Sequence, residues 1–148
     1  MFMKNCWYVA AYDRELKDGG PLGRTLLGEP VVMFRDSRGR AIALEDRCCH
    51  RHLPLSLGRI TGDTVQCGYH GLEFDAAGTC IAVPGQSKVP PGARVRSFPV
   101  IEKYSMIWIW PGDAELADES TIPELPWLDH PDWARTGGHL HMKADYRL

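Results

Sequence analysis

Two short segments of the chain carry the side chains that bind metal ions most often in proteins. The first gives Cys48-x-His50 within the run EDRCCHRHLPLSLG, and the second gives Cys67-x-x-His70 within QCGYHG. Sixteen residues separate His50 from Cys67. Each segment therefore offers one thiol and one imidazole, and both groups bind zinc and iron. The spacing predicts a metal centre with four ligands, namely Cys48, His50, Cys67 and His70.

Two inorganic units suit a set of two cysteines and two histidines. A structural zinc ion takes four ligands in a tetrahedron, but its sequence pattern usually pairs like with like, C-x2-4-C and then H-x3-5-H. In a Rieske [2Fe-2S] cluster two cysteines hold one iron and two histidines hold the other. Each segment here mixes the two ligand types. This mixture favours the iron-sulfur cluster and leaves a structural zinc module as the alternative.

The size and composition of the chain describe an ordinary folded domain. It has 148 residues, of which 44% are hydrophobic and 24% are charged, and its formal net charge is -2. This balance argues against disorder and against a basic surface that binds nucleic acid. The start, MFMKNCWYVAAYDREL, has neither the long apolar run of a membrane span nor a secretory cleavage pattern. We therefore expect no membrane association and a cytoplasmic location.

The elements that would position the ligands are short strands. Gly and Pro residues divide the chain into brief apolar or alternating runs, typical of an antiparallel, mostly β architecture. The run MIWIW is apolar on both faces, so it predicts a central core strand that buries Trp108 and Trp110. The predicted strands are 24–27, 31–35, 41–46, 64–66, 72–74, 95–100 and 106–110. Strands 41–46 and 64–66 run directly into the two ligand segments and place them in neighbouring hairpin-like loops.

The composition of the sequence changes after PGD at 111–113. Acidic and proline-interrupted stretches follow, and they predict a connector on the surface. The final run GGHLHMKADYRL then predicts a new extended segment whose strand pattern is still unfinished at Leu148. We therefore expect a cluster-binding domain over residues 1–112. Residues 113–148 are expected to be a connector and the first strand of a further domain, so that the chain is the front part of a longer polypeptide.

The run CCHRHLPLSLGRITGDTVQCGYHGLEFD, residues 48–75, resembles the motif of Rieske non-haem iron oxygenases, C-P-H-R-x-x-P-L-S-x-G followed by C-x-Y-H-G. The resemblance extends to NCWYVAAYDREL, SFPVIEKYSMIWIWPGD and WLDHPDWARTGGHLHMKADYRL. These are similar to the N-terminal part of oxygenase components of the vanillate O-demethylase and dicamba-demethylase group. The resemblance implies a Rieske fold of antiparallel sheets, with a small cluster-binding subdomain formed by two hairpin loops.

The same resemblance assigns the ligands to individual irons. By it, Cys48 and Cys67 hold the iron that stays ferric, and His50 and His70 hold the iron that accepts the electron. Rieske proteins of respiratory complexes have two further cysteines, joined in a disulfide that braces the loops, where this chain has Leu53 and Tyr69. The cluster is therefore similar to the low-potential ferredoxin and oxygenase branch.

The resemblance also implies components that lie outside this chain. In such oxygenases a second domain holds a mononuclear Fe(II) on two histidines and a carboxylate, and none of those ligands is expected here. An NAD(P)H-dependent flavin/iron-sulfur reductase or a ferredoxin supplies electrons, and the full-length protein is a homotrimer. The chain is thus expected to relay electrons in a monooxygenase or dioxygenase that acts on an aromatic substrate. A free-standing Rieske ferredoxin is the alternative.

The remaining cysteines and histidines are predicted to be bystanders. Cys49 stands where the family motif has proline, so we expect a loop-packing thiol and a less rigid loop. His52 is expected to lie in the loop with its ring partly in water. Arg51 is expected either to screen the charge of the cluster or contact another subunit, or to have only a surface role. Cys6 and Cys80 are expected to pack within strands, the pair His139 and His141 is expected to have a structural or interfacial role, and no chemistry is expected of His130.

Overall fold

The computed structural model describes residues 2–16, 19–138 and 140–145, and within these ranges the protein is built from short strands and 3-10 turns with no α-helix. All strand pairs are antiparallel. The strands are β1 (Tyr8–Tyr12), β2 (Leu22–Leu26), β3 (Glu29–Arg35), β4 (Ala41–Glu45), β5 (Arg59–Thr61), β6 (Thr64–Gln66), β7 (Glu73–Phe74), β8 (Cys80–Ala82), β9 (Ser97–Phe98), β10 (Val100–Lys103) and β11 (Met106–Ile109). The 3-10 turns are η1 (Asp13–Leu16), η2 (Leu55–Leu57), η3 (Ala114–Leu116), η4 (Glu119–Thr121) and η5 (Pro126–Leu128). The mostly β fold with antiparallel sheets is confirmed.

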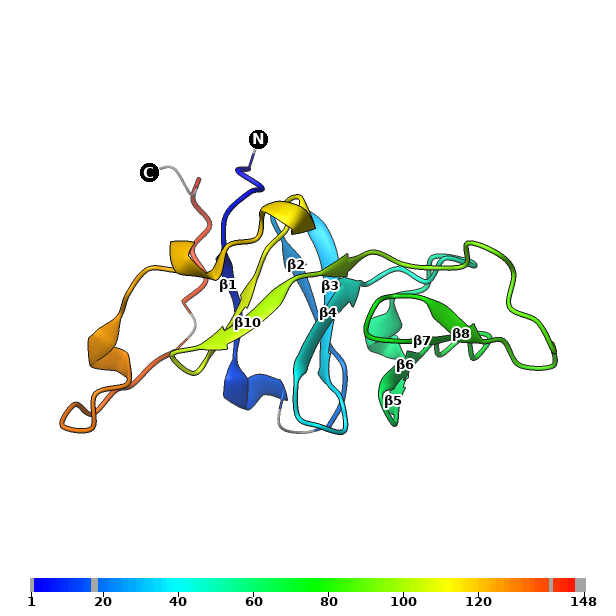
Figure 1. Ribbon diagram of the computed structural model, residues 1–148, viewed down its shortest axis with the longest axis horizontal. Helices are drawn as coiled ribbons and strands as arrows, with labels where there is room; N and C mark the ends of the chain where they lie inside the picture. The colour runs from blue at the N-terminus through cyan, green and yellow to red at the C-terminus, as the bar shows by residue number, and fades with distance from the viewer. Residues whose placement is uncertain (1, 17–18, 139, 146–148) are drawn as a thin grey trace.

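The strands form three sheets. Their orders are β1-β11-β10, β2-β3-β4-β9 and β5-β6-β7-β8. In Figure 1 the third sheet lies at the right-hand end, away from β1 and β10, and the second sheet lies between the other two. The third sheet and its loops form a small subdomain, as expected from the resemblance.

Strand β3 connects two apolar cores because both of its faces are buried. Val31 and Met33 belong to the apolar core shared with β1 and β11, whereas Val32 and Phe34 belong to the core of the third sheet. The alternation follows from the two-residue period of side chains on a strand. All four side chains are at most 1% exposed. An apolar run without polar alternation is the sequence signature of such a central strand.

Strand β11 is the central strand of its sheet, as MIWIW predicted. Ile107 and Ile109 face the core shared with β3, and Trp108 faces a third core that also includes Trp7 and Trp110. The indole nitrogens of Trp7 and Trp110 donate to the carbonyl oxygens of Asp118 and Asp113, at 2.8 and 2.7 Å. Asp113, Asp118 and the buried Ile122 of this core belong to the segment that follows β11. The tryptophan core therefore attaches this segment to the sheet.

Several elements differ from the sequence expectations. The predicted strand 95–100 is split into β9 and β10 at Pro99, which has no N–H for a ladder hydrogen bond. Strands β1, β5 and β8 were not predicted. β1 pairs with β11, which is distant in sequence, whereas β5 and β8 have only three residues each and pair with the adjacent strands β6 and β7. Residues 114–128 form η3 to η5, and residues 140–145 contain no strand. His139 lies outside the described residues, and the domain division at 112/113 stays a prediction.

None of the helical turns in the described part of the chain has the length and apolar composition needed to cross a bilayer.

Candidate metal centre

The first ligand loop follows β4 and is closed by its own backbone. The amide of Cys48 donates to the carbonyl oxygen of Leu53 at 2.9 Å, and the amide of His52 donates back to the carbonyl oxygen of Cys48 at 2.9 Å. His52 has a φ of 56°, in the left-handed region. A closed turn of this kind holds His50, Arg51 and His52 at the surface while Cys48 itself is buried.

The second ligand loop connects β6 to β7 and repeats this hydrogen-bond pattern. The amide of Cys67 donates to the carbonyl oxygen of Leu72 at 2.8 Å, and the amide of Gly71 donates to the carbonyl oxygen of Cys67 at 3.1 Å. Gly71 has a φ of 74°, so it occupies the place that His52 holds in the first loop. The two loops thus share one backbone design, in which a cysteine opens the turn and a left-handed residue closes it.

Two glycines allow the loops to touch. A Cβ atom on Gly58 would lie 2.0 Å from the carbonyl oxygen of Gln66, and one on Gly68 would lie 2.9 Å from the carbonyl oxygen of Leu57. Both contacts are with backbone atoms, which move only with their strands. Glycine is therefore required where the chain after the first loop crosses the second loop.

A buried carboxylate anchors the first loop to the segment that follows it. Asp46 is 8% exposed, and its two oxygens accept hydrogen bonds from the amide and the hydroxyl of Ser56, at 2.7 and 2.6 Å. Because both carboxylate oxygens are satisfied, the buried charge is compensated by hydrogen bonds. This contact fixes the two ends of the loop that contains Cys48 and His50.

The two thiols lie together in the interior. Cys48 and Cys67 are 2% and 3% exposed, and both belong to the apolar core of the third sheet. Burial raises the pKa of Cys48 to about 11, and its interaction with the neighbouring Cys67 thiol adds to the rise. Such a pair of thiols becomes a pair of thiolates only when a metal replaces the protons. The donor chemistry fits a metal bound on the inner side of the site.

The two imidazoles lie together at the surface. The ring centroids of His50 and His70 are 4.6 Å apart, with an interplanar angle of 60°, and both residues are exposed. Tyr69 covers one side of His70, with centroids 3.8 Å apart and planes at 33°. Sequence order mixes the ligand types, whereas the fold sorts them into an inner thiol pair and an outer imidazole pair. This sorting fits a two-iron unit with one sulfur-bound and one nitrogen-bound iron.

No group of three His, Cys, Asp or Glu side chains among the residues that the structure describes is arranged to hold a single metal ion. The fit to a two-iron unit rests on the pairing of like ligands.

The other cysteines have the surroundings of packing residues. Cys49 is half-buried against the core of the third sheet, and Cys80 is buried within it. Burial raises the pKa of both thiols, so both are protonated at neutral pH. Cys6 is half-buried near the start of the chain, and all five cysteines are free. These observations support the expectation that Cys49, Cys80 and Cys6 are bystanders.

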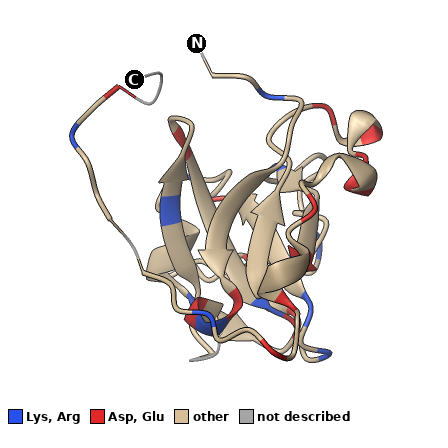
Figure 2. Ribbon diagram, turned by 90° about the vertical axis from the view of Figure 1, so that its left-hand side faces the viewer, with Lys and Arg blue, Asp and Glu red and all other residues tan. Residues whose placement is uncertain are grey.

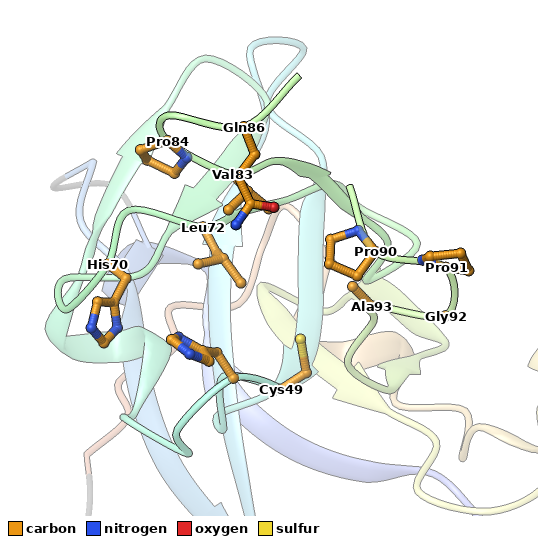
Figure 3. A pocket seen from close by; sticks show the side chains of 11 residues that line it. Cys49, His70, Leu72, Val83, Pro84, Gln86, Pro90, Pro91, Gly92 and Ala93 are labelled. Atoms are coloured by element: carbon orange, nitrogen blue, oxygen red, sulfur yellow. The ribbon is translucent and has the colours of Figure 1, made fainter. Parts of the chain in front are cut away.

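A groove runs beside the imidazole pair. Its volume is about 630 Å³, and it is formed by the two ligand loops and by a proline-rich segment between β8 and β9. Figure 3 shows His70 and Pro84 at one end, Pro90 and Pro91 at the other, and the Cys49 sulfur directed into the space between them. The sequence gives PGQ at 84–86 and PPG at 90–92, but loop signals alone do not say that this segment returns to the metal centre.

His52 is exposed, as expected, and its left-handed backbone makes a prediction about stability. Replacing His52 by glycine should raise the free energy of unfolding by up to about 1 kcal/mol, because glycine adopts positive φ without the Cβ penalty. His52→Val should lower it, since a branched side chain resists this conformation. Urea denaturation of the cluster-loaded protein measures both. Loss of iron from His52→Gly would instead make His52 a ligand.

The remaining candidates do not belong to either ligand pair. Arg51 is exposed directly after His50. His130 belongs to the segment after β11, where its Nδ1 accepts a hydrogen bond from the amide of Asp132 at 3.3 Å. His141 is exposed near the end of the described chain. Of these three, only Arg51 adjoins the metal centre.

Known proteins resemble the chain over its whole length. The toluene-4-sulfonate monooxygenase system iron-sulfur subunit of Comamonas testosteroni is 48% identical over 148 residues, covering 100% of this chain and 43% of that protein. The vanillate O-demethylase oxygenase subunit of Pseudomonas sp. (strain HR199 / DSM 7063) is also 48% identical, covering 100% of this chain and 41% of that protein. The chain thus spans well under half the length of these relatives.

A solved structure supports the same relationship. The crystal structure of apo dicamba monooxygenase superposes with a TM-score of 0.83 at 46% identity, covering 88% of this chain and 40% of that one. The family model described as the Rieske [2Fe-2S] domain matches residues 6–99, a span that contains both ligand loops. The chain therefore belongs to the Rieske [2Fe-2S] domain family.

Proposed function

We propose that Cys48, His50, Cys67 and His70 bind the [2Fe-2S] cluster of this domain, and that the domain transfers electrons. The single observation that carries the proposal is the sorting of the ligands into a buried thiol pair and an exposed imidazole pair. When bound, the cluster supplies a one-electron couple whose potential is raised by the two neutral imidazoles relative to a cluster held by four thiolates.

The residues around the ligands have separate tasks in this proposal. The buried thiols keep water from the inner side of the site, and the repeated backbone turns fix the spacing of the loops. The exposed rings of His50 and His70 give the shortest path between the site and a partner protein. Tyr69, stacked on His70, restrains the orientation of that ring.

We further propose that the domain is part of an oxygenase component that acts on an aromatic substrate. Support comes from the relatives, which are named as subunits of monooxygenase and demethylase systems. An NAD(P)H-dependent reductase or ferredoxin would deliver electrons in the cytoplasm. A mononuclear iron in a catalytic domain would receive them, and the assembly would be a homotrimer. Residues 1–112 would form the cluster domain, and residues 113–148 would lead into the catalytic domain.

Metal analysis of the purified protein tests the first part of the proposal. We expect about two irons and two acid-labile sulfides per chain, and an EPR signal typical of a Rieske centre after reduction with dithionite. Zinc without sulfide would contradict the proposal and support a structural zinc module.

Treatment with a strong chelator should remove the signal and lower the melting temperature, because metal binding contributes to folding.

A further inference from the structure

The proline-rich segment between β8 and β9, residues 83–94, forms one side of the groove, and we call it the groove wall. Two backbone hydrogen bonds fix the end of the wall to the third sheet. The amide of Val95 donates to the carbonyl oxygen of Gly78 at 2.8 Å, and the amide of Cys80, the first residue of β8, donates to the carbonyl oxygen of Ala93 at 2.9 Å. Both bonds connect the wall to β8 or to the turn before it.

The amide of Arg94 connects the wall to the first ligand loop. Arg94 forms an antiparallel bridge with Thr79, and the two bonds just described lie on either side of this bridge. The two residues of such a pair exchange no hydrogen bond with each other, so the N–H of Arg94 is directed away from Thr79. It donates instead to the sulfur of Cys49. One peptide unit of the wall is therefore bonded to β8 through its carbonyl oxygen and to the first ligand loop through its amide.

Cys49 differs from the family motif, which has proline at this place. A proline side chain has no atom that accepts a hydrogen bond, whereas a cysteine sulfur is a weak acceptor. Figure 3 shows the sulfur of Cys49 directed toward the wall. Cys49 also packs, together with Val83, Val89 and Ala93 of the wall, against the core of the third sheet. The side chain of Cys49 thus lies between the loop and the wall and contacts both.

We propose that Cys49 is a positioning residue of the metal centre, because its sulfur accepts the amide hydrogen of Arg94 and holds the groove wall beside the loop that carries His50. The hydrogen bond depends on the fold alone, whereas its value for the metal centre rests on the proposed function. The wall lines the same groove as both imidazoles. Its position therefore controls how much solvent reaches the imidazole side of the site.

Amide hydrogen exchange of the cluster-loaded protein tests the proposal, measured by mass spectrometry with fragmentation that resolves single residues. Cys49→Ala removes the acceptor, and exchange at Arg94 should rise about fivefold, because the loss of one hydrogen bond shifts local opening by roughly this factor. Cys49→Ser keeps an acceptor and should stay within about twofold of the wild type. The amide of Val95, whose acceptor is Gly78, should exchange at the wild-type rate in both variants.

Cys6→Ala is the matched control, because Cys6 is also a half-buried free cysteine. It belongs to the N-terminal segment, which lies apart from the third sheet in Figure 1 and runs along the top of Figure 2. Its replacement should leave exchange at Arg94 unchanged.

Iron release to bathophenanthroline disulfonate gives a second measurement. The initial rate should rise in Cys49→Ala by about the same factor as the exchange rate, because release then passes through the opened wall. The rate should return to the wild-type value in Cys49→Ser.

Wild-type exchange at Arg94 in Cys49→Ala would overturn the inference. Equal acceleration in Cys49→Ala and Cys49→Ser would also overturn it, since the sulfur would then act through packing and not as an acceptor. Absence of an iron-sulfur signal in the wild-type protein would instead contradict the proposed function, while the exchange rate at Arg94 would still report on the hydrogen bond.

Discussion

Replacement of Cys48 or Cys67 by serine is expected to abolish the iron-sulfur centre. In the proposed site the two thiols form the inner ligand pair, and Cys80, which is buried in the same core, is not part of that pair. Serine keeps the size of the side chain but does not supply a thiolate. Iron and sulfide should fall to background, the visible absorbance should disappear, and the melting temperature should drop, because the bound metal contributes to folding.

Cys49→Ser is the matched control for this experiment. Cys49 adjoins Cys48 in the same loop but is half-buried and lines the groove. The variant should retain about two irons per chain and the Rieske EPR signal. A cluster that survives in Cys48→Ser but is lost in Cys49→Ser would reverse the ligand assignment of the first loop.

Gly58→Ala is expected to cause the largest loss of stability of any single methyl addition to the site. The new Cβ would lie 2.0 Å from the carbonyl oxygen of Gln66, and Gln66 is paired with Arg59 in the β5–β6 ladder. Relief of this clash requires the first loop to move away from the second. We expect the free energy of unfolding to fall by more than about 4 kcal/mol, or the protein to fail to fold.

Gly20→Ala provides the corresponding control. A Cβ on Gly20 has no atom within 4 Å, and its backbone does not adopt positive φ. Its effect on urea denaturation should be smaller than about 0.5 kcal/mol. If Gly58→Ala retained wild-type stability and cluster content, the close backbone crossing between the two loops would not be required for the site.

The mostly β fold and the central strand β11 were predicted correctly because each depends on a local pattern, and the four ligands stay a prediction. Trp108 and Trp110 lie in a run that is apolar on both faces, and both are buried. The cysteine and histidine spacing likewise predicted one site made from two loops. Such features can be predicted without knowing which distant segments of the chain are in contact.

The features that the sequence did not predict depend on contacts between distant segments. Strand β1 forms because β11, which is far away along the chain, completes its hydrogen bonds. The pairing of like ligands was expected from the resemblance, whereas the close approach of the two loops at Gly58 and Gly68 was not predicted. The position of segment 83–93 beside the metal centre was not predicted either, because it also depends on a contact between separate segments.

The two buried faces of β3 have a mechanical consequence. Val32 and Phe34 anchor the cluster subdomain, while Val31 and Met33 anchor the sheet that carries the tryptophan core. Strand β4 contributes in the same way, because Ile42 and Leu44 belong to the first of these cores and Ala43 to the second. Repositioning the metal centre relative to the tryptophan core would require breaking a close-packed interior, which resists deformation. For the proposed electron transfer, the distance from the metal centre to an acceptor would then depend on how whole molecules assemble.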